Sequence, residues 1–280
     1  MNRFFVVLTV CLLFSSFQLP AQTKRALVIG LGEQEDKSWA KINGDKDVPY
    51  VKEMLVRMGY TDVTTLVNKQ ATKAGIVSAF ETLAAKCAEG DVVYIHFSGH
   101  GQQVTDVNGD ERPDTFDEAW IPYDAYMKYD AQRYTGEKHL VDDEINVLLK
   151  NVKSKIGSKG GMLVVVDACH SGGSTREPDA SETIRGASDQ FIIPGDHHGN
   201  AAKQTEQWLT LTACKNYQRN EEMKDPQIGK LTYALYLLAK EGKVTMNEIE
   251  NFMHKHRSSW PQNPELSGDT STYDLSDFFR

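Results

Sequence analysis

Residues 162–173, with the sequence MLVVVDACHSGG, form the stretch from which the rest of the chain is best interpreted. Five consecutive apolar residues, three of them valine, predict a central parallel strand that is covered on both faces. The carboxyl end of such a strand lies at the crevice where open α/β sheets bind ligands. The strand therefore presents Cys169 at a ligand-binding edge, and the glycines that follow allow the backbone to turn closely around a substrate.

A second predicted strand, residues 91–98, ends in the same manner, with His100 set between two glycines. A free thiol is only a few per cent ionised at neutral pH, and a neighbouring imidazole activates it by accepting its proton. We therefore predict that Cys169 is a nucleophile and His100 its base. The backbone amides of Gly101 and Cys169 are the candidate donors to the oxyanion.

Other roles for these two side chains are open when each is taken alone. Cys169 could be a buried core cysteine, and His100 could cap a loop. A zinc site would also use Cys and His, but no Cys-x-x-Cys pattern accompanies Cys169, and the remaining histidine pair, 197–198, lies in a predicted loop. The position of both residues at equivalent strand ends favours the catalytic pair.

Predicted strands and helices alternate along the chain, which indicates one α/β domain over residues 22–280 with a mainly parallel sheet and helices on both faces. Apart from 162–168, the predicted strands are 25–31, 62–67, 91–98 and 208–213, and the predicted helices are 47–58, 72–87, 142–152, 231–240 and 245–256. Residues 101–141 and 174–204 show little periodicity and few apolar anchors, so we expect two mobile loops. Residues 260–280 are expected to form a tail.

The N-terminus predicts export. Arg3 precedes an apolar run over residues 4–17, which is shorter than the roughly 20 residues of a membrane span. A signal peptide of residues 1–21, cut after Ala21, fits this pattern, and an uncleaved anchor is the alternative. We expect a periplasmic or extracellular monomer without a stable membrane span. The formal charge of −8, without a basic run, gives no support to a nucleic-acid partner.

Three cysteines remain after removal of the signal peptide: Cys87, Cys169 and Cys214. An odd number in an exported protein leaves at least one free thiol. A disulfide between Cys87 and Cys214 is possible, and two buried apolar cysteines are the alternative.

Both motifs resemble those of a known family. Residues 94–101, YIHFSGHG, and 166–172, VDACHSG, are similar to the His and Cys motifs of the metacaspase branch of caspase-like cysteine peptidases. Similar segments extend over about residues 24–268, including the acidic segments 116–124 and 142–144. The resemblance implies a three-layer caspase-like fold with about six central strands, and a cysteine endopeptidase activity. Caspases carry Gln-Ala-Cys at the nucleophile, where this chain has Asp-Ala-Cys.

The family pattern also implies a pocket for a basic substrate side chain. Its two acids match Asp167 and Asp47 in this chain, although Asp47 could instead be a helix N-cap. Each carboxylate would contribute a charged hydrogen bond of about 1.5–3 kcal/mol to Arg or Lys, whereas an acidic side chain would be repelled. Protein or peptide substrates cut after Arg or Lys, and not after Asp, are therefore expected.

No cofactor is expected for the chemistry itself, but calcium is a possible activator. The acidic stretch 106–114 has oxygen ligands at spacings similar to those of calcium loops, without being an EF-hand. The resemblance implies a Ca²⁺ site on Asp117, Asp142 and Asp143. In this chain the segment between Asp124 and Asp142 is longer than usual, and a further family acid is replaced by Arg176. A solvated acidic loop is the alternative.

An enzyme that cuts after basic residues could also cut itself, and members of the family often do. The candidate positions are Arg176, Arg185 and Lys203, all in the second predicted loop. Two other functions fit the same fold: a catalytically idle binding protein, and a cysteine hydrolase of a non-peptide amide or ester.

Overall fold

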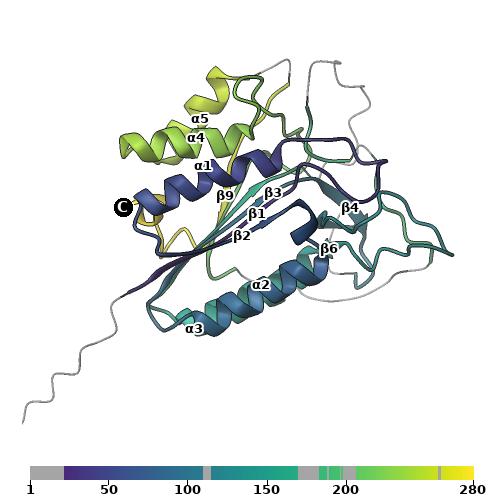
Figure 1. Cartoon of the computed structure of the whole chain (residues 1–280), viewed down its shortest axis with the longest axis horizontal. Coiled ribbons are helices and arrows are strands. Elements are labelled where there is room, and N and C mark those ends of the chain that lie inside the picture. The colour runs from purple at the N-terminus through teal and green to yellow at the C-terminus, as the bar shows by residue number, and fades with distance from the viewer. Residues whose placement is uncertain are drawn as a thin grey trace, which may run out of the picture.

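A six-stranded sheet forms the middle layer of the molecule (Figure 1). The computed structural model describes residues 22–109, 115–169, 183–187, 189–195, 197, 206–257 and 260–280, so the predicted signal peptide lies outside the described residues. The strand order is β2-β1-β3-β7-β8-β9, and only the edge strand β9 runs antiparallel to its neighbour. The strands are β1 Lys24–Gly30, β2 Asp62–Val67, β3 Val92–Ser98, β7 Gly161–Asp167, β8 Leu209–Thr212 and β9 Glu265–Gly268. The predicted mainly parallel sheet of about six strands is confirmed.

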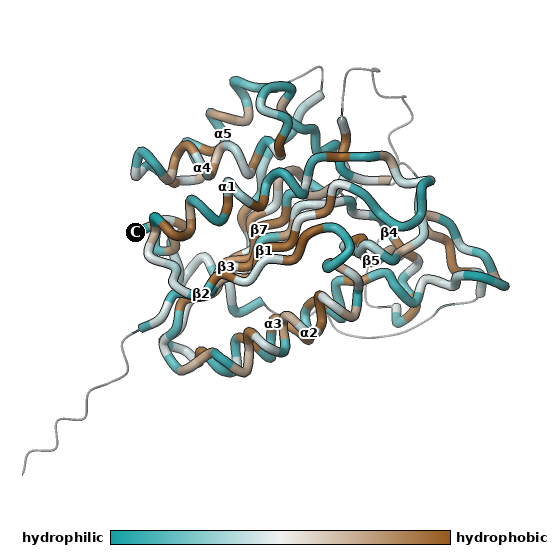
Figure 2. Tube along the Cα trace, in the orientation of Figure 1, coloured by the Kyte–Doolittle hydropathy of each residue, from teal (hydrophilic) through white to brown (hydrophobic). Residues whose placement is uncertain are grey.

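Helices cover both faces of this sheet, as predicted. One face carries α1 (Gly44–Arg57), α4 (Lys230–Glu241) and α5 (Met246–Lys255), and the other carries α2 (Lys73–Lys86) and α3 (Asp142–Ile156) (Figure 1). Successive side chains of a strand point to opposite faces, so Val28 packs into one core and Leu27 into the other. Figure 2 shows the resulting apolar strands between helices that are hydrophilic on their outer sides. Burial on both faces explains the uninterrupted apolar runs in the sequence.

The pairing of β3 with β7 places the two sequence motifs side by side. The strands are parallel and in register, with Ser98 opposite Asp167. The Gly99 N–H donates to the Asp167 carbonyl at 3.4 Å, which continues the pairing just past the strand ends. His100 and Cys169 therefore leave the sheet at the same edge.

Two predictions of irregular structure are wrong. Within residues 101–141, β4 (Gly101–Thr105), β5 (Phe116–Trp120) and β6 (Leu140–Val141) form a second, antiparallel sheet. These strands are short and rich in polar residues, so their alternation is too weak to detect in the sequence. The expected tail contains β9 and a 3₁₀ helix, η2 (Leu275–Phe279), which buries Phe278 and Phe279 in the core shared with α1 and α4.

Among the described residues, no helix is both long enough and apolar enough to cross a membrane.

Buried histidines make the fold sensitive to acid. Burial lowers the pKa of His96 and His100 to about 4 and that of His139 to about 3. In the unfolded chain these residues have a pKa of about 6.5, so between pH 6.5 and 4 the unfolded state binds more protons than the folded state. The free energy of unfolding should therefore fall as the pH falls through this window, by up to about 1.4 kcal/mol per pH unit for each histidine.

Urea unfolding of a Cys169→Ala chain at pH 7.5, 6 and 5 measures this effect. The unfolding midpoint should drop toward pH 5, and His139→Gln should show a smaller drop. A midpoint that does not change between pH 7.5 and 5 would contradict the assignment of neutral buried histidines.

Candidate active site

Two buried carboxylates form the floor of a pocket at the carboxyl edge of the sheet. Asp47 lies in the first turn of α1, and Asp167 is the last residue of β7; both side chains are fully buried. Asp47 accepts hydrogen bonds from the Ser98 hydroxyl at 2.8 Å and from the Gly229 N–H at 2.9 Å. Asp167 accepts from the Asn220 amide at 2.7 Å. These donors hold both carboxylates in fixed positions.

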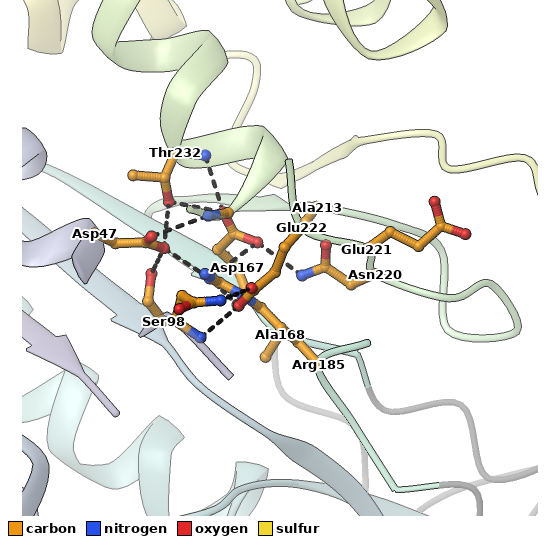
Figure 3. A network of polar contacts seen from close by, with 12 residues as sticks. Asp47, Ser98, Asp167, Ala168, Arg185, Ala213, Asn220, Glu221, Glu222 and Thr232 are labelled. Carbon is orange, nitrogen blue, oxygen red and sulfur yellow. Dashed lines mark hydrogen bonds and ion pairs between the residues drawn. The ribbon is translucent and has the colours of Figure 1, made fainter. Parts of the chain in front are cut away.

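The side chain of Arg185 fills this pocket (Figure 3). It is fully buried, and its Nη1 lies 2.7 Å from Asp47 Oδ2 and 3.5 Å from Asp167 Oδ1. A third carboxylate, Glu222, accepts from Arg185 Nε at 3.0 Å and also accepts from the Asn43 N–H at 2.7 Å. One guanidinium is thus surrounded by three acids that come from separate parts of the chain.

The protonation behaviour of the cluster follows from its burial and its charges. Burial raises the pKa of Asp47, and the Arg185 guanidinium offsets only part of that effect. Burial also favours the neutral form of Asp167, but Arg185, together with hydrogen bonds from Asn220 and Thr232, holds the pKa of that carboxyl below its ordinary value. Burial alone would lower the pKa of Arg185, yet the surrounding carboxylates raise it. The pocket is therefore built to hold a guanidinium cation.

The backbone of Arg185 lies between the two strand-end residues, Cys169 and His100. Its carbonyl oxygen accepts the Cys169 N–H at 2.7 Å, and the N–H of the next residue, Gly186, donates to His100 Nδ1 at 2.9 Å. The thiol of Cys169 lies 2.9 Å from the Gln218 carbonyl oxygen. The peptide bond between Arg185 and Gly186 is thus held from its carbonyl side by Cys169 and from its nitrogen side by His100.

The contacts of His100 define which ring nitrogen carries the proton. Nε2 lies 2.8 Å from the Ala40 carbonyl oxygen, which can only accept, whereas Nδ1 faces the Gly186 N–H, which can only donate. Both contacts are satisfied by the neutral tautomer with its proton on Nε2. This agrees with the pKa of His100, which burial lowers to about 4. His100 is therefore neutral at neutral pH, and its Nδ1 lone pair accepts the N–H of the bond after Arg185.

Residues on both sides of this bond are held as an extended peptide. Before it, the Arg185 N–H donates to the Asn220 carbonyl at 2.9 Å, and the Glu222 N–H donates to the Thr183 carbonyl at 3.0 Å. After it, the Ala187 N–H donates to the Gly101 carbonyl at 3.0 Å. The sequence predicts few buried side chains in residues 174–204. Among the described residues 183–187 and 189–195 this prediction is wrong, because Arg185 and Phe191 are both buried. Their partners are distant in sequence, so the local pattern did not reveal them.

The sequence of the chain matches a known protein family. A family model described as "Metacaspase, peptidase C14 domain" matches residues 24–178, which is more than half of the chain and includes both strand-end motifs. The chain belongs to the metacaspase family.

Relatives with curated descriptions agree with this assignment. Metacaspase-1A of Neurospora crassa is 29% identical over 228 residues, which cover 78% of this chain and 43% of the relative. Metacaspase-2 of Arabidopsis thaliana is 33% identical over 157 residues, which cover 53% of this chain and 34% of the relative. The chain thus spans less than half the length of these two relatives.

Solved structures show the same fold at lower sequence identity. A protein from Geobacter sulfurreducens superposes with a TM-score of 0.64 at 24% identity, covering 91% of this chain and 98% of that one. Caspase-1 from Spodoptera frugiperda superposes with a TM-score of 0.54 at 11% identity, covering 88% of this chain and 86% of that one. The expected caspase-like fold is confirmed.

The metacaspase fold brings together four of the residues that the sequence singled out: Asp47, His100, Asp167 and Cys169. Asp47 is no N-cap, because Asn43 precedes α1 and Asp47 faces the pocket. The Cys169 N–H donates to the Arg185 carbonyl, and its role as an oxyanion donor stays a prediction. For Gly101, the contact with this segment is made by its carbonyl, so its role as an oxyanion donor stays a prediction.

Sequence reasoning missed several residues that complete the pocket. Ser98 lies within the quoted HFSGHG motif and faces Asp47, so the motif itself could have revealed it. Asn220 and Glu222 lie in a stretch without periodicity and carried no signal. Gly229 leaves room for the ion pairs, because a Cβ there would lie 2.1 Å from Asp167 Oδ2 and 2.6 Å from Arg185 Nη1.

The three cysteines of the described chain are free thiols, so the possible Cys87–Cys214 disulfide is not formed. Cys87 is half-buried at the end of α2, and burial raises its pKa to about 11. The Cys214 thiol lies 3.5 Å from the Gln218 carbonyl oxygen, the same oxygen that the Cys169 thiol contacts. Cys214 therefore lies beside the candidate nucleophile, and not beside Cys87.

The predicted calcium ligands gather near one another. Asp117 is on β5, and Asp142 and Asp143 form the first turn of α3, directly after β6, which pairs with β5 through Ala119 opposite Val141. Within the part of the chain that the structure describes, no group of three or more His, Cys, Asp or Glu residues is arranged to hold a metal ion. Residues 110–114 of the acidic stretch lie outside the described residues, so calcium binding stays a prediction.

Arg185 should contribute strongly to the stability of the uncut chain. In a Cys169→Ala background, Arg185→Met leaves buried carboxylates without their cation, which typically costs about 3–5 kcal/mol. The matched control is Arg57→Met, which removes an exposed ion pair with Glu53 and should lower the stability far less. Urea unfolding at pH 7.5 measures both, and equal losses would contradict the buried ion-pair cluster.

Proposed function

We propose that the chain is a cysteine endopeptidase that cleaves peptide bonds after arginine or lysine. One observation carries this proposal: an arginine of the chain itself occupies the acidic pocket while its carbonyl group contacts the backbone amide of Cys169. A peptide held in this manner presents its carbonyl carbon to the nucleophile and its side chain to the acids. The family assignment gives independent support for peptidase chemistry.

The chemistry proceeds through an acyl-enzyme. His100 accepts the proton of the Cys169 thiol, and the thiolate sulfur bonds to the substrate carbonyl carbon. The Cys169 N–H donates to the resulting oxyanion, as it donates to the Arg185 carbonyl. When the C–N bond breaks, the protonated His100 returns the proton to the leaving nitrogen, which lies where the Gly186 N–H faces Nδ1. Water then hydrolyses the thioester and restores the thiol.

The acids of the pocket select the substrate side chain by charge. Asp47, Asp167 and Glu222 surround a cation that is fully removed from water, so an acidic side chain in this position would face uncompensated like charges. Arginine meets Glu222 through Nε and Asp47 through Nη1, which lysine cannot do with a single ammonium group. The positive side chains of Arg and Lys both complement the negative charge of the pocket, whereas the negative side chains of Asp and Glu do not.

Self-processing forms part of the proposal. Of the three candidate positions, Arg185 is the one whose following bond lies between Cys169 and His100, so we assign cleavage to the bond between Arg185 and Gly186. Arg176 and Lys203 lie outside the described residues. Before cleavage, Arg185 fills the acidic pocket, so the uncut chain is closed to other substrates.

Export and calcium activation complete the proposal. The apolar N-terminal run supports a signal peptide, and Asp117, Asp142 and Asp143 support a Ca²⁺ site near the second sheet. Bound calcium would neutralise these carboxylates.

Two other functions remain as alternatives. An idle binding protein would have no need of a neutral histidine facing a peptide nitrogen, and an amidase for small substrates would have no need of extended backbone contacts on both sides of the bond. Both features favour an endopeptidase.

Cleavage of internally quenched peptides with Arg, Lys or Asp before the cut bond and glycine after it tests the proposed function. The Arg and Lys peptides should be cleaved, and the Asp peptide should be at least about 100-fold slower, given a penalty of several kcal/mol for like charges. Cys169→Ala and His100→Ala should abolish activity, and Asp47→Asn or Asp167→Asn should raise KM for the Arg peptide. Chelation of calcium gives the metal dependence in the same assay. Cleavage of the Asp peptide in preference to the Arg peptide would overturn the proposal.

A further inference from the structure

Beyond the bond at Arg185, the chain contacts the edge of β4 at Ala187 and again at Phe191. Phe191 pairs with Val104 in parallel, its N–H donates to the Gln103 carbonyl at 2.8 Å, and its carbonyl accepts the Thr105 N–H at 3.0 Å. Together with the Ala187 N–H on the Gly101 carbonyl, these bonds follow β4 from one end to the other. The edge of the second sheet therefore holds the peptide that follows the cleavable bond.

One side chain of this peptide enters a cluster of aromatic rings. Phe191 is 1% exposed, and its ring centroid lies 4.4 Å from that of His139, 5.7 Å from Tyr134 and 6.1 Å from Tyr129. The next side chain, Ile192, is 51% exposed and takes no part in the cluster. The site thus takes the sixth residue after the bond, counted with Gly186 as the first.

The aromatic cluster, Tyr129, Tyr134 and His139, is held in place by bonds that do not involve Phe191. The Tyr134 hydroxyl lies 2.8 Å from His139 Nδ1, and His139 Nε2 lies 2.9 Å from Gln102 Oε1. A side chain at Gly136 would occupy the space of the Phe191 ring, since a Cβ there would lie 2.8 Å from it. The cluster is thus a formed site for a ring.

The first position after the bond is restricted to a residue without a side chain. A Cβ on Gly186 would lie 2.6 Å from the Cys169 carbonyl oxygen and 3.0 Å from Cys169 Cβ. Backbone atoms at this distance cannot move aside without displacing the nucleophile. Glycine therefore fits directly after the cut bond.

We propose that the edge of β4 and the aromatic cluster form a recognition site for the portion of a substrate that follows the cut bond. This inference rests on the proposed function. The site takes a peptide with glycine in the first position and an aromatic side chain in the sixth. The chain's own residues 186–187 and 189–193 show how the occupant contacts the site, and peptide or protein substrates of this pattern would bind in the same place.

Internally quenched peptides test this proposal with fully processed wild-type enzyme. The first peptide carries the sequence of residues 183–193, TIRGASDQFII. The second replaces its phenylalanine by alanine, and the third moves the phenylalanine to the fifth position after the cut. Burial of a phenyl ring predicts kcat/KM about tenfold or more higher for the first peptide than for the other two. A short internally quenched peptide that ends at the glycine after the arginine, TIRG, reports whether the enzyme cleaves after arginine at all.

The outcomes separate the two claims. Failure to cleave the short TIRG peptide would count against the proposed function. If the short control peptide is cleaved and the three longer peptides are cleaved at equal rates, the recognition site is overturned. The same conclusion applies if the enzyme's own cut segment stays in place and blocks the site.

Self-cleavage provides a second readout with a matched pair of variants. Phe191→Ala should slow cleavage at Arg185 about tenfold, whereas Ile192→Ala, which removes an exposed apolar side chain, should change it less than twofold. Equal rates for the two variants would count against a role for the aromatic side chain.

Discussion

The arrangement of the active site depends on one buried ion-pair cluster, in which Arg185 lies among Asp47, Asp167 and Glu222. A buried carboxylate is costly unless a cation and hydrogen bonds compensate it. Three carboxylates at one place would repel one another without the guanidinium. The uncut chain therefore requires Arg185 in this pocket, and the position of its backbone between Cys169 and His100 follows from that requirement.

The same cluster connects recognition with regulation. Asp47 comes from α1, Asp167 from the end of β7 and Glu222 from the segment before α4. The pocket therefore forms only when the sheet and both flanking helices are assembled. Under the proposed function, a substrate arginine would take the place of Arg185 and offer the same charge. Cleavage after Arg185 would separate this arginine from the chain that follows it. The side chain that stabilises the uncut chain would thus also close its active site.

The sequence revealed the parts of this site that local patterns encode. Apolar runs that end in Gly-His-Gly and Asp-Ala-Cys located His100 and Cys169, and parallel strand pairing brought them to one edge. Arg185 was identified only as one of three basic residues in a loop, because nothing local distinguishes a buried arginine from an exposed one. Glu222, Asn220 and the aromatic cluster are joined to the site by tertiary contacts, which periodicity does not report. The second sheet escaped detection because its strands are short and polar.

The dependence of self-cleavage on protein concentration tests the central claim most directly. If the bond after Arg185 already lies in the active site of its own chain, freshly prepared uncut protein should convert with a first-order rate constant that does not change over a 100-fold dilution. The new N-terminus should be Gly186, and a Cys169→Ala chain should stay uncut. A rate constant that rises in proportion to concentration, or a first cut at another residue, would contradict the account.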